Sequence, residues 1–344
     1  MNLKPLRLAA ACTCALATLA AAPAANAEPI KLRVADSFPT THWVSVNITR
    51  HMMDRVTEMT NKAVEFEYYP AEQLGKAKDL LSLANSGVAD ISYVAPAFVG
   101  EKMPLSVVGE LPLPTNSGSS CPLTMAYWKI AQPGGILDKR EFAPNGVRLP
   151  FTIGLPPYQI TTKPKFAGLK EISGMKVRTT GAPKELALRK LGAVPVQIPS
   201  PEINEAMSRG TVDGALMPIG SIPSYGLDTV VKHFTVGENF GSFVANYVIS
   251  ERKWKTLPSN VQKALQELGP ELSKRGCEMA DREEEANVKK LQQAGATIVS
   301  LNAADKAALK EMQRSVGSAW AEGLDKRGKP GTEILKAFTG AMPR

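Results

Sequence analysis

The chain has 344 residues, 44% hydrophobic and 22% charged, which is long enough for two domains with their own cores. Its 41 Lys and Arg against 33 Asp and Glu give a formal net charge of +8. This surplus is spread along the sequence, so it can help to attract anions but argues against nucleic acid as a partner. After the N-terminal segment, no run is long and apolar enough to cross a bilayer, which argues against an integral membrane protein.

The first 27 residues have the pattern of a secretory signal peptide. Lys4 and Arg7 precede an apolar run at 8–22, and Ala25-Asn26-Ala27 is a small-x-small cleavage pattern. A transmembrane anchor would need ~20 apolar residues, and a proline ends this run too early. We therefore predict that residues 1–27 are removed on export and that the protein works in the periplasm.

Strand and helix patterns alternate after this segment, at a spacing that favours parallel βαβ units. In chain order we expect a strand at 30–35, a loop at 36–42, a helix to about 59, a strand at 63–69, a loop at 70–75, a helix at 76–86 and a strand at 90–94.

The middle of the chain begins with a Pro-, Gly- and Ser-rich segment at 103–122. The expected elements that follow are a helix at 123–130, strands at 146–153 and 158–162, a connector at 163–173, a strand within 174–180, a helix at 184–191, a strand at 194–198, a helix at 200–210, a strand at 212–218, a return segment at 229–240 and a strand at 243–249. We place a domain crossing at Gly154-Leu155-Pro156-Pro157, which breaks the strand before it.

From residue 258 onwards the pattern is almost wholly helical. We expect helices at 258–295, 303–326 and 332–338, with a short extended piece at 296–301. The predicted division is an α/β lobe at 28–150 and 236–257, a second α/β lobe at 151–235, and C-terminal helices at 258–344 that pack on both.

Cysteines and histidines supply no metal or catalytic pattern. Cys12 and Cys14 lie in the signal segment, and the three histidines are scattered through the chain. Cys121 and Cys277 could pair in an oxidising compartment, but spacing alone cannot assign one distant pair. The expectation that both cysteines are free, buried thiols is at least as good as the expectation of a disulfide. No phosphate-binding loop or nucleophile elbow occurs, so we expect no cofactor and no catalytic residues.

One arginine stands out within Gly174-Met175-Lys176-Val177-Arg178-Thr179-Thr180, where a short strand runs into a turn before a helix. Ligands of open α/β sheets gather where strands end and helices begin. The guanidinium of Arg178 can bind a carboxylate through two parallel hydrogen bonds, which a lysine cannot. Taken alone, a solvated strand-end arginine in a surface ion pair is the better interpretation, because most arginines are exposed.

Two lobes, export and the lack of a catalytic motif favour a periplasmic solute-binding protein, which closes around its ligand by hinge motion. The chain resembles the extracytoplasmic solute receptors of tripartite ATP-independent periplasmic (TRAP) transporters, the DctP-like family. The resemblance is carried, at the family's spacing, by Tyr69-Pro70-Ala71-Glu72-Gln73-Leu74-Gly75, Ser86-Gly87-Val88-Ala89-Asp90, Ile172-Ser173-Gly174-Met175-Lys176-Val177-Arg178, Leu191-Gly192-Ala193-Val194-Pro195 and Arg209-Gly210-Thr211-Val212-Asp213-Gly214.

This resemblance implies a two-lobed (Venus-flytrap) α/β fold with hinge-crossing strands and a long C-terminal helix. It also implies a non-enzymatic, monomeric receptor that delivers an organic acid to the permease subunits of a TRAP transporter. The arginine equivalent to Arg178 usually holds the ligand carboxylate in this family, which reverses the interpretation of that residue.

Many members have a second arginine on the preceding strand, where this chain has Tyr158 within a residue or two. We therefore expect a monocarboxylate, with aromatic and 2-oxo or 2-hydroxy acids as candidates. For Tyr158, Phe38 and Phe98 the alternative role is packing in the core, and for Glu72 it is capping of the next helix. The predicted ligand-binding residues are Arg178, Tyr158, Phe38, Glu72, Gln73, Ala95, Phe98, Met217 and Pro218.

Three other functions stay open at this point. The chain could serve another transport or sensing system, it could be a secreted enzyme of the same two-lobed shape, or it could be a scaffold without a specific ligand.

Overall fold

The computed structural model describes residues 28–114 and 118–343, so the predicted signal peptide lies outside the described residues. Its first sheet has the strand order β2-β1-β3-β10-β4. The strands are β1 (Ile30–Ala35), β2 (Val64–Tyr69), β3 (Ile91–Val94), β4 (Val147–Leu155) and β10 (Phe243–Ser250). As predicted, β1 pairs in parallel with β2 and β3, whereas β10 is antiparallel to β3 and β4. We call the part built on this sheet lobe 1.

The second sheet has the order β11-β9-β5-β8-β6-β7 and forms lobe 2. Its strands are β5 (Gln159–Thr162), β6 (Lys176–Thr179), β7 (Val194–Gln197), β8 (Gly214–Met217), β9 (His233–Thr235) and β11 (Thr297–Val299). β6 is parallel to β7 and β8, and β5 is antiparallel to β8. The two sheets confirm the predicted two-lobed α/β fold.

Two segments carry the chain between the sheets. β4 continues to Leu155, beyond the expected end at 153, and the chain then enters β5. The return runs from β9 to β10. The two crossings are hydrogen-bonded to each other, because Tyr158 N donates to Gly241 O at 2.7 Å and Phe240 N donates to Tyr158 O at 3.2 Å. These two crossing segments are the places where the chain can bend as a hinge.

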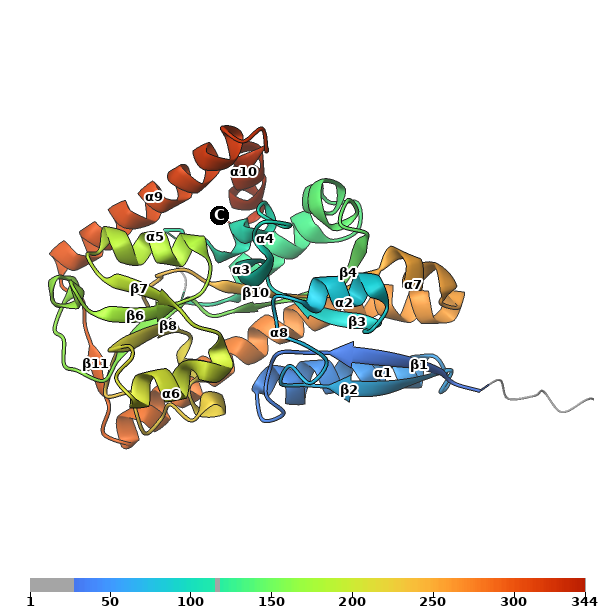
Figure 1. The fold of residues 1–344 in the computed structure, drawn as a ribbon, viewed down its shortest axis with the longest axis horizontal. Helices are drawn as coiled ribbons and strands as arrows, with labels where there is room; N and C mark the ends of the chain where they lie inside the picture. The colour runs from blue at the N-terminus through green and yellow to red at the C-terminus, as the bar shows by residue number, and fades with distance from the viewer. Residues whose placement is uncertain (1–27, 115–117, 344) are drawn as a thin grey trace, which may run out of the picture.

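Helices cover both sheets (Figure 1). Within the described residues, none is long and apolar enough to span a membrane. The α-helices are α1 (Arg50–Met59), α2 (Leu80–Ser86), α3 (Pro96–Val99), α4 (Cys121–Ala131), α5 (Ala182–Lys190), α6 (Ile203–Ser208), α7 (Glu251–Thr256), α8 (Ser259–Gln293), α9 (Ala303–Asp325) and α10 (Gly331–Ala341). The shorter helical turns are η1 (Ser45–Thr49), η2 (Ser106–Glu110), η3 (Asp138–Phe142), η4 (Leu169–Ile172), η5 (Ser200–Glu202), η6 (Ile219–Ser221) and η7 (Pro223–Tyr225).

The long helix α8 contacts both lobes, as the family resemblance implied (Figure 1). Arg275 Nε donates to Asn47 O in lobe 1 at 3.2 Å, and Glu284 accepts from Gly220 N in lobe 2 at 2.7 Å. The helix also lies close against β4. A Cβ atom at Gly269 would come within 2.3 Å of a backbone oxygen of β4, so only glycine fits at this crossing.

Cys121 and Cys277 form a disulfide, with their Cα atoms 4.8 Å apart. The alternative of two free buried thiols is therefore wrong. The bond ties α4 to the middle of α8, and Asp281 reinforces the junction by accepting hydrogen bonds from the backbone N and the hydroxyl of Ser120 at 2.7 and 2.8 Å. Neither the sequence separation of 156 residues nor the local composition could have specified this pairing.

Candidate functional site

A cavity lies where the two lobes meet. Its lining comes mainly from the carboxyl ends of parallel strands and the segments after them, together with the start of the antiparallel strand β10. This is the edge where open α/β sheets bind ligands. The lining residues are Ser37, Phe38, Tyr93, Leu155, Tyr158, Arg178, Ser200, Met217, Pro218, Ser221, Tyr225 and Phe243.

Arg178, on β6, has the only charged side chain among the described residues that line this cavity. It is 1% exposed. Its Nε donates to Ile198 O at 2.8 Å, Nη1 to Leu216 O at 3.3 Å and Nη2 to Ser200 Oγ at 2.9 Å. A guanidinium has about five N–H donors, so one N–H remains on each terminal nitrogen.

No carboxylate of the described residues lies within ion-pair distance of Arg178. Burial lowers the pKa of Arg178 from its usual value, but an arginine keeps its proton at neutral pH. Buried charges in proteins are normally paired. The surface-pair interpretation of Arg178 is therefore wrong, and the site presents a buried cation with two N–H groups to spare.

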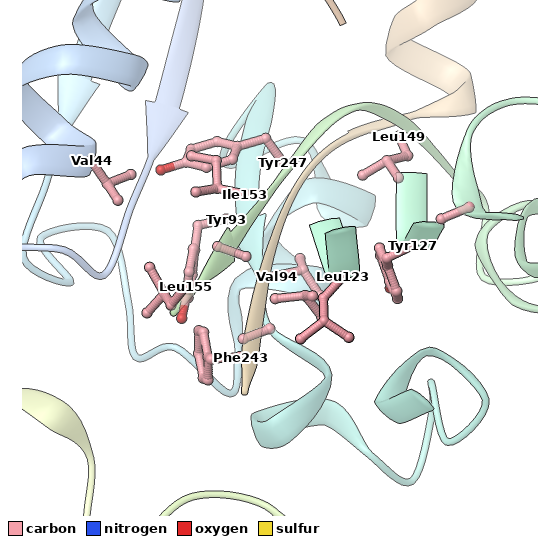
Figure 2. Close-up of a cluster of buried hydrophobic side chains, with 14 of the residues drawn as sticks. Val44, Tyr93, Val94, Leu123, Tyr127, Leu149, Ile153, Leu155, Phe243 and Tyr247 are labelled. Carbon is pink, nitrogen blue, oxygen red and sulfur yellow. The ribbon is translucent and has the colours of Figure 1, made fainter. Parts of the chain in front are cut away.

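Aromatic rings form much of the remaining wall. The Tyr158 ring stacks on Phe243 with centroids 6.3 Å apart, and Phe38 meets Tyr93 edge-on at 5.2 Å. Figure 2 shows Tyr93 and Phe243 coming together from β3 and β10 beside Leu155. Such a wall suits a flat apolar group, because aromatic pairs prefer stacked or edge-on contacts.

A buried ion pair joins the lobes directly behind this wall. Lys184, on α5 of lobe 2, and Glu110, on η2 of lobe 1, are both fully buried, with Nζ and Oε2 3.0 Å apart. Lys184 Nζ also donates to Ser242 O at 2.7 Å and lies 5.1 Å from the ring centroid of Tyr158 and 5.8 Å from that of Phe243. The pair therefore supports two cavity-lining rings from the side that faces away from solvent.

A histidine makes a second polar contact between the lobes. Val44 N donates to His42 Nδ1 at 3.2 Å, so Nε2 carries the ring proton and donates to Ser221 Oγ at 3.0 Å. Burial lowers the pKa of His42 to about 3, which keeps the ring neutral. His42 also stacks on Phe38, with centroids 4.3 Å apart. The lobes are thus held together on both sides of the cavity.

Five of the nine predicted site residues line the cavity: Phe38, Tyr158, Arg178, Met217 and Pro218. The other four are absent from its lining. Glu72 accepts a hydrogen bond from Ala77 N at 2.9 Å and pairs with Lys76 at 3.0 Å, in the turns before α2, whose N-terminus has no side-chain cap. Gln73 is exposed, Ala95 is buried at the start of α3, and Phe98 packs behind Phe243 at 6.0 Å.

The prediction missed seven lining residues: Ser37, Tyr93, Leu155, Ser200, Ser221, Tyr225 and Phe243. Ser37, Tyr93 and Leu155 lie at or just after strand ends, so the rule that identified Arg178 could have found them. Tyr225 lies in a turn well beyond a strand, and no local signal marks it.

Comparison with known proteins identifies one family. The model of the family described as bacterial extracellular solute-binding protein, family 7 (DctP), matches residues 38–322. The chain is 27% identical over 298 residues to the C4-dicarboxylate-binding periplasmic protein DctP of Rhodobacter capsulatus, covering 82% of each chain. It is 26% identical to a solute-binding protein of Albidiferax ferrireducens, over 74% of this chain and 75% of that protein.

Solved structures of TRAP solute-binding proteins share the fold. One from Rhodoferax ferrireducens, in complex with copurified benzoate, has a TM-score of 0.83 at 24% identity and covers 91% of this chain and 97% of its own. One from Bordetella bronchiseptica, with bound mandelate, has a TM-score of 0.82 at 22% identity and covers 91% and 98%. At this identity the likeness establishes the fold alone.

Proposed function

Because the chain belongs to the DctP family of bacterial extracellular solute-binding proteins, we propose that it captures a small monocarboxylic acid in the periplasm and delivers it to the permease of a TRAP transporter. The observation that carries this proposal is Arg178, a buried cation that lines the cavity between the lobes and has no acidic partner among the described residues. A carboxylate could accept one hydrogen bond from each terminal nitrogen.

The lining argues for one carboxylate and an aromatic or other apolar remainder. A second carboxylate would enter a wall of aromatic, aliphatic and hydroxyl side chains without a second cation, and an unpaired buried charge is costly. Benzoate and mandelate, which the two structural relatives bind, are acids of this kind. This adds support to an aromatic monocarboxylate.

Other parts of the proposal concern the form in which the receptor works. We propose that residues 1–27 are cleaved on export, that the receptor is a monomer, and that the lobes divide at the boundaries predicted above. A cavity enclosed by both lobes fits a receptor that must open to admit its ligand.

Titration calorimetry tests the ligand class. The mature protein would be unfolded, dialysed and refolded to remove any bound acid, then titrated with benzoate, mandelate, pyruvate and succinate. Binding of a monocarboxylate without binding of succinate is the expected result. Stronger binding of succinate than of every monocarboxylate would contradict the one-cation argument.

Substitutions of Arg178 test the carboxylate contact. Two charge-assisted hydrogen bonds are worth about 1.5–3 kcal/mol each, so Arg178→Ala should weaken binding by about a hundredfold or more. Arg178→Lys should restore little, because an ammonium cannot form the parallel pair. Arg189→Ala is the matched control, since that arginine lies on the adjacent helix α5 with its side chain 61% exposed. Wild-type affinity in Arg178→Lys would refute the bidentate contact.

A further inference from the structure

Tyr93 brings a polar group into the cavity from the opposite lobe to Arg178. It lies on β3 of lobe 1, is 1% exposed and lines the cavity. Its ring is fixed by edge-on contacts with Phe38 at 5.2 Å and Tyr247 at 6.2 Å between centroids. Figure 2 shows its hydroxyl end beside Leu155 and Phe243, which line the same cavity.

The hydroxyl of Tyr93 has no hydrogen-bond partner among residues 28–114 and 118–343. Other buried or half-buried tyrosines of lobe 1 do have partners. Tyr247 donates to Asp36 at 2.7 Å, Tyr68 donates to Asp36 at 3.1 Å, and Tyr127 accepts from Asn246 at 3.1 Å. A buried tyrosine hydroxyl usually finds a partner, and leaving one unpaired is costly.

Resting on the proposed function, we infer that the Tyr93 hydroxyl hydrogen-bonds a second, uncharged polar group of the bound acid, a hydroxyl or carbonyl oxygen located away from the carboxylate. The ligand class is then a hydroxy- or oxo-substituted monocarboxylic acid whose carboxylate binds Arg178. Such a ligand bridges the lobes, because Arg178 belongs to lobe 2 and Tyr93 to lobe 1.

Tyr93 lies in the other lobe from the polar groups near Arg178, so we assign it a different part of the ligand. Ser200 accepts a hydrogen bond from Arg178 Nη2 at 2.9 Å, and Tyr225 lines the cavity from the same lobe as the arginine. These groups serve the carboxylate, which every candidate acid shares. A contact that distinguishes a substituted acid from its parent must come from elsewhere in the lining, and Tyr93 supplies an unpaired hydroxyl.

The test compares matched pairs of acids on the wild type, Tyr93→Phe and Tyr225→Phe. The pairs are phenylacetate with mandelate, and benzoate with each of its three monohydroxy derivatives. In the wild type, at least one hydroxy acid should bind more tightly than its parent. Tyr93→Phe should lose about three- to tenfold in affinity for that acid and retain its affinity for the parent. Tyr225→Phe should change both members of the pair by the same factor.

Each other outcome has a definite meaning. An equal loss for both members in Tyr93→Phe would place the hydroxyl on the carboxylate or in the wall, and would overturn the inference. A wild type that prefers no hydroxy acid to its parent would overturn it too, without relying on how the variant folds. If Arg178→Ala binds the parent acids as tightly as the wild type, the proposed function itself fails, and that result is independent of Tyr93.

Discussion

The buried ion pair between Lys184 and Glu110 is the contact whose loss should be most costly to the joined lobes. Replacing one partner of a buried pair costs about 3–5 kcal/mol, because the other charge stays buried without compensation. In Glu110→Gln, Lys184 keeps its hydrogen bond to Ser242 O and its position over two aromatic rings. We therefore expect a cost near the lower limit, about 3 kcal/mol of unfolding free energy.

Urea denaturation followed by tryptophan fluorescence measures this cost, and Glu185→Gln is the matched control. Glu185 also pairs with a basic side chain, Arg189 at 2.8 Å on the same helix α5, but that arginine is 61% exposed. Such helix-surface pairs contribute about 0.3–0.5 kcal/mol. If Glu110→Gln costs no more than Glu185→Gln, the reasoning from burial is wrong.

The pH dependence and the double variant give two further checks. Burial lowers the pKa of Lys184 and raises that of Glu110, so each charge depends on the other. Without Glu110, the folded pKa of Lys184 should fall further below its unfolded value. The unfolded state of Glu110→Gln then binds more protons than its folded state. The loss of unfolding free energy caused by this substitution should therefore shrink as pH rises from 7 towards 10. The double variant Glu110→Gln/Lys184→Met should be more stable than either single variant.

Two other predictions concern His42 and the disulfide. The pKa of His42 is lowered to about 3 in the joined lobes, whereas in separated lobes it should return to about 6.5. Joining of the lobes requires a neutral His42, so it costs nothing extra above pH 6.5 and becomes less favourable as pH falls from 6.5 towards 3. Benzoate affinity measured by calorimetry should therefore drop about thirtyfold between pH 7.5 and 5. His42→Gln should lose most of this slope, and an unchanged slope would refute the assignment. The disulfide closes a separation of 156 residues, for which loop entropy gives at most about 5 kcal/mol. Cys121→Ala/Cys277→Ala should therefore melt several degrees lower by calorimetry, and an unchanged melting temperature would contradict a stabilising role.

The sequence predicted those parts of the site that depend on local pattern. Arg178, Met217 and Pro218 were identified because strand ends are marked by periodicity and by the turn residues that follow them. The same rule applies to Tyr93, but a tyrosine in an apolar strand is indistinguishable from an ordinary core residue until its hydroxyl is found unpaired. Glu72 shows the converse case, since a polar residue in a loop can bind the backbone, and this one lies outside the cavity lining.

Contacts between distant segments could not be predicted. Lys184 and Glu110 lie 74 residues apart in the sequence, and each alone has the pattern of an exposed charge, the commonest state of both residue types. The fold could be predicted more fully than the site, because strand and helix periodicity is local whereas the cavity wall is assembled from both lobes. The boundaries of β4 and α2 differed by two to four residues for the same reason, since tertiary packing sets where an element ends.

The hydrogen bonds of Arg178 have a consequence for the order of events in binding. All three acceptors, Ile198 O, Leu216 O and Ser200 Oγ, belong to lobe 2 together with the arginine itself. Its orientation is therefore set before the lobes meet, and an incoming acid can engage lobe 2 alone. Association then has two stages: a bimolecular encounter that salt slows, followed by a unimolecular closure that brings Tyr93 onto the ligand. We therefore expect contacts from lobe 2 to affect both the arrival and the release of the acid, and contacts from lobe 1 to affect its release alone.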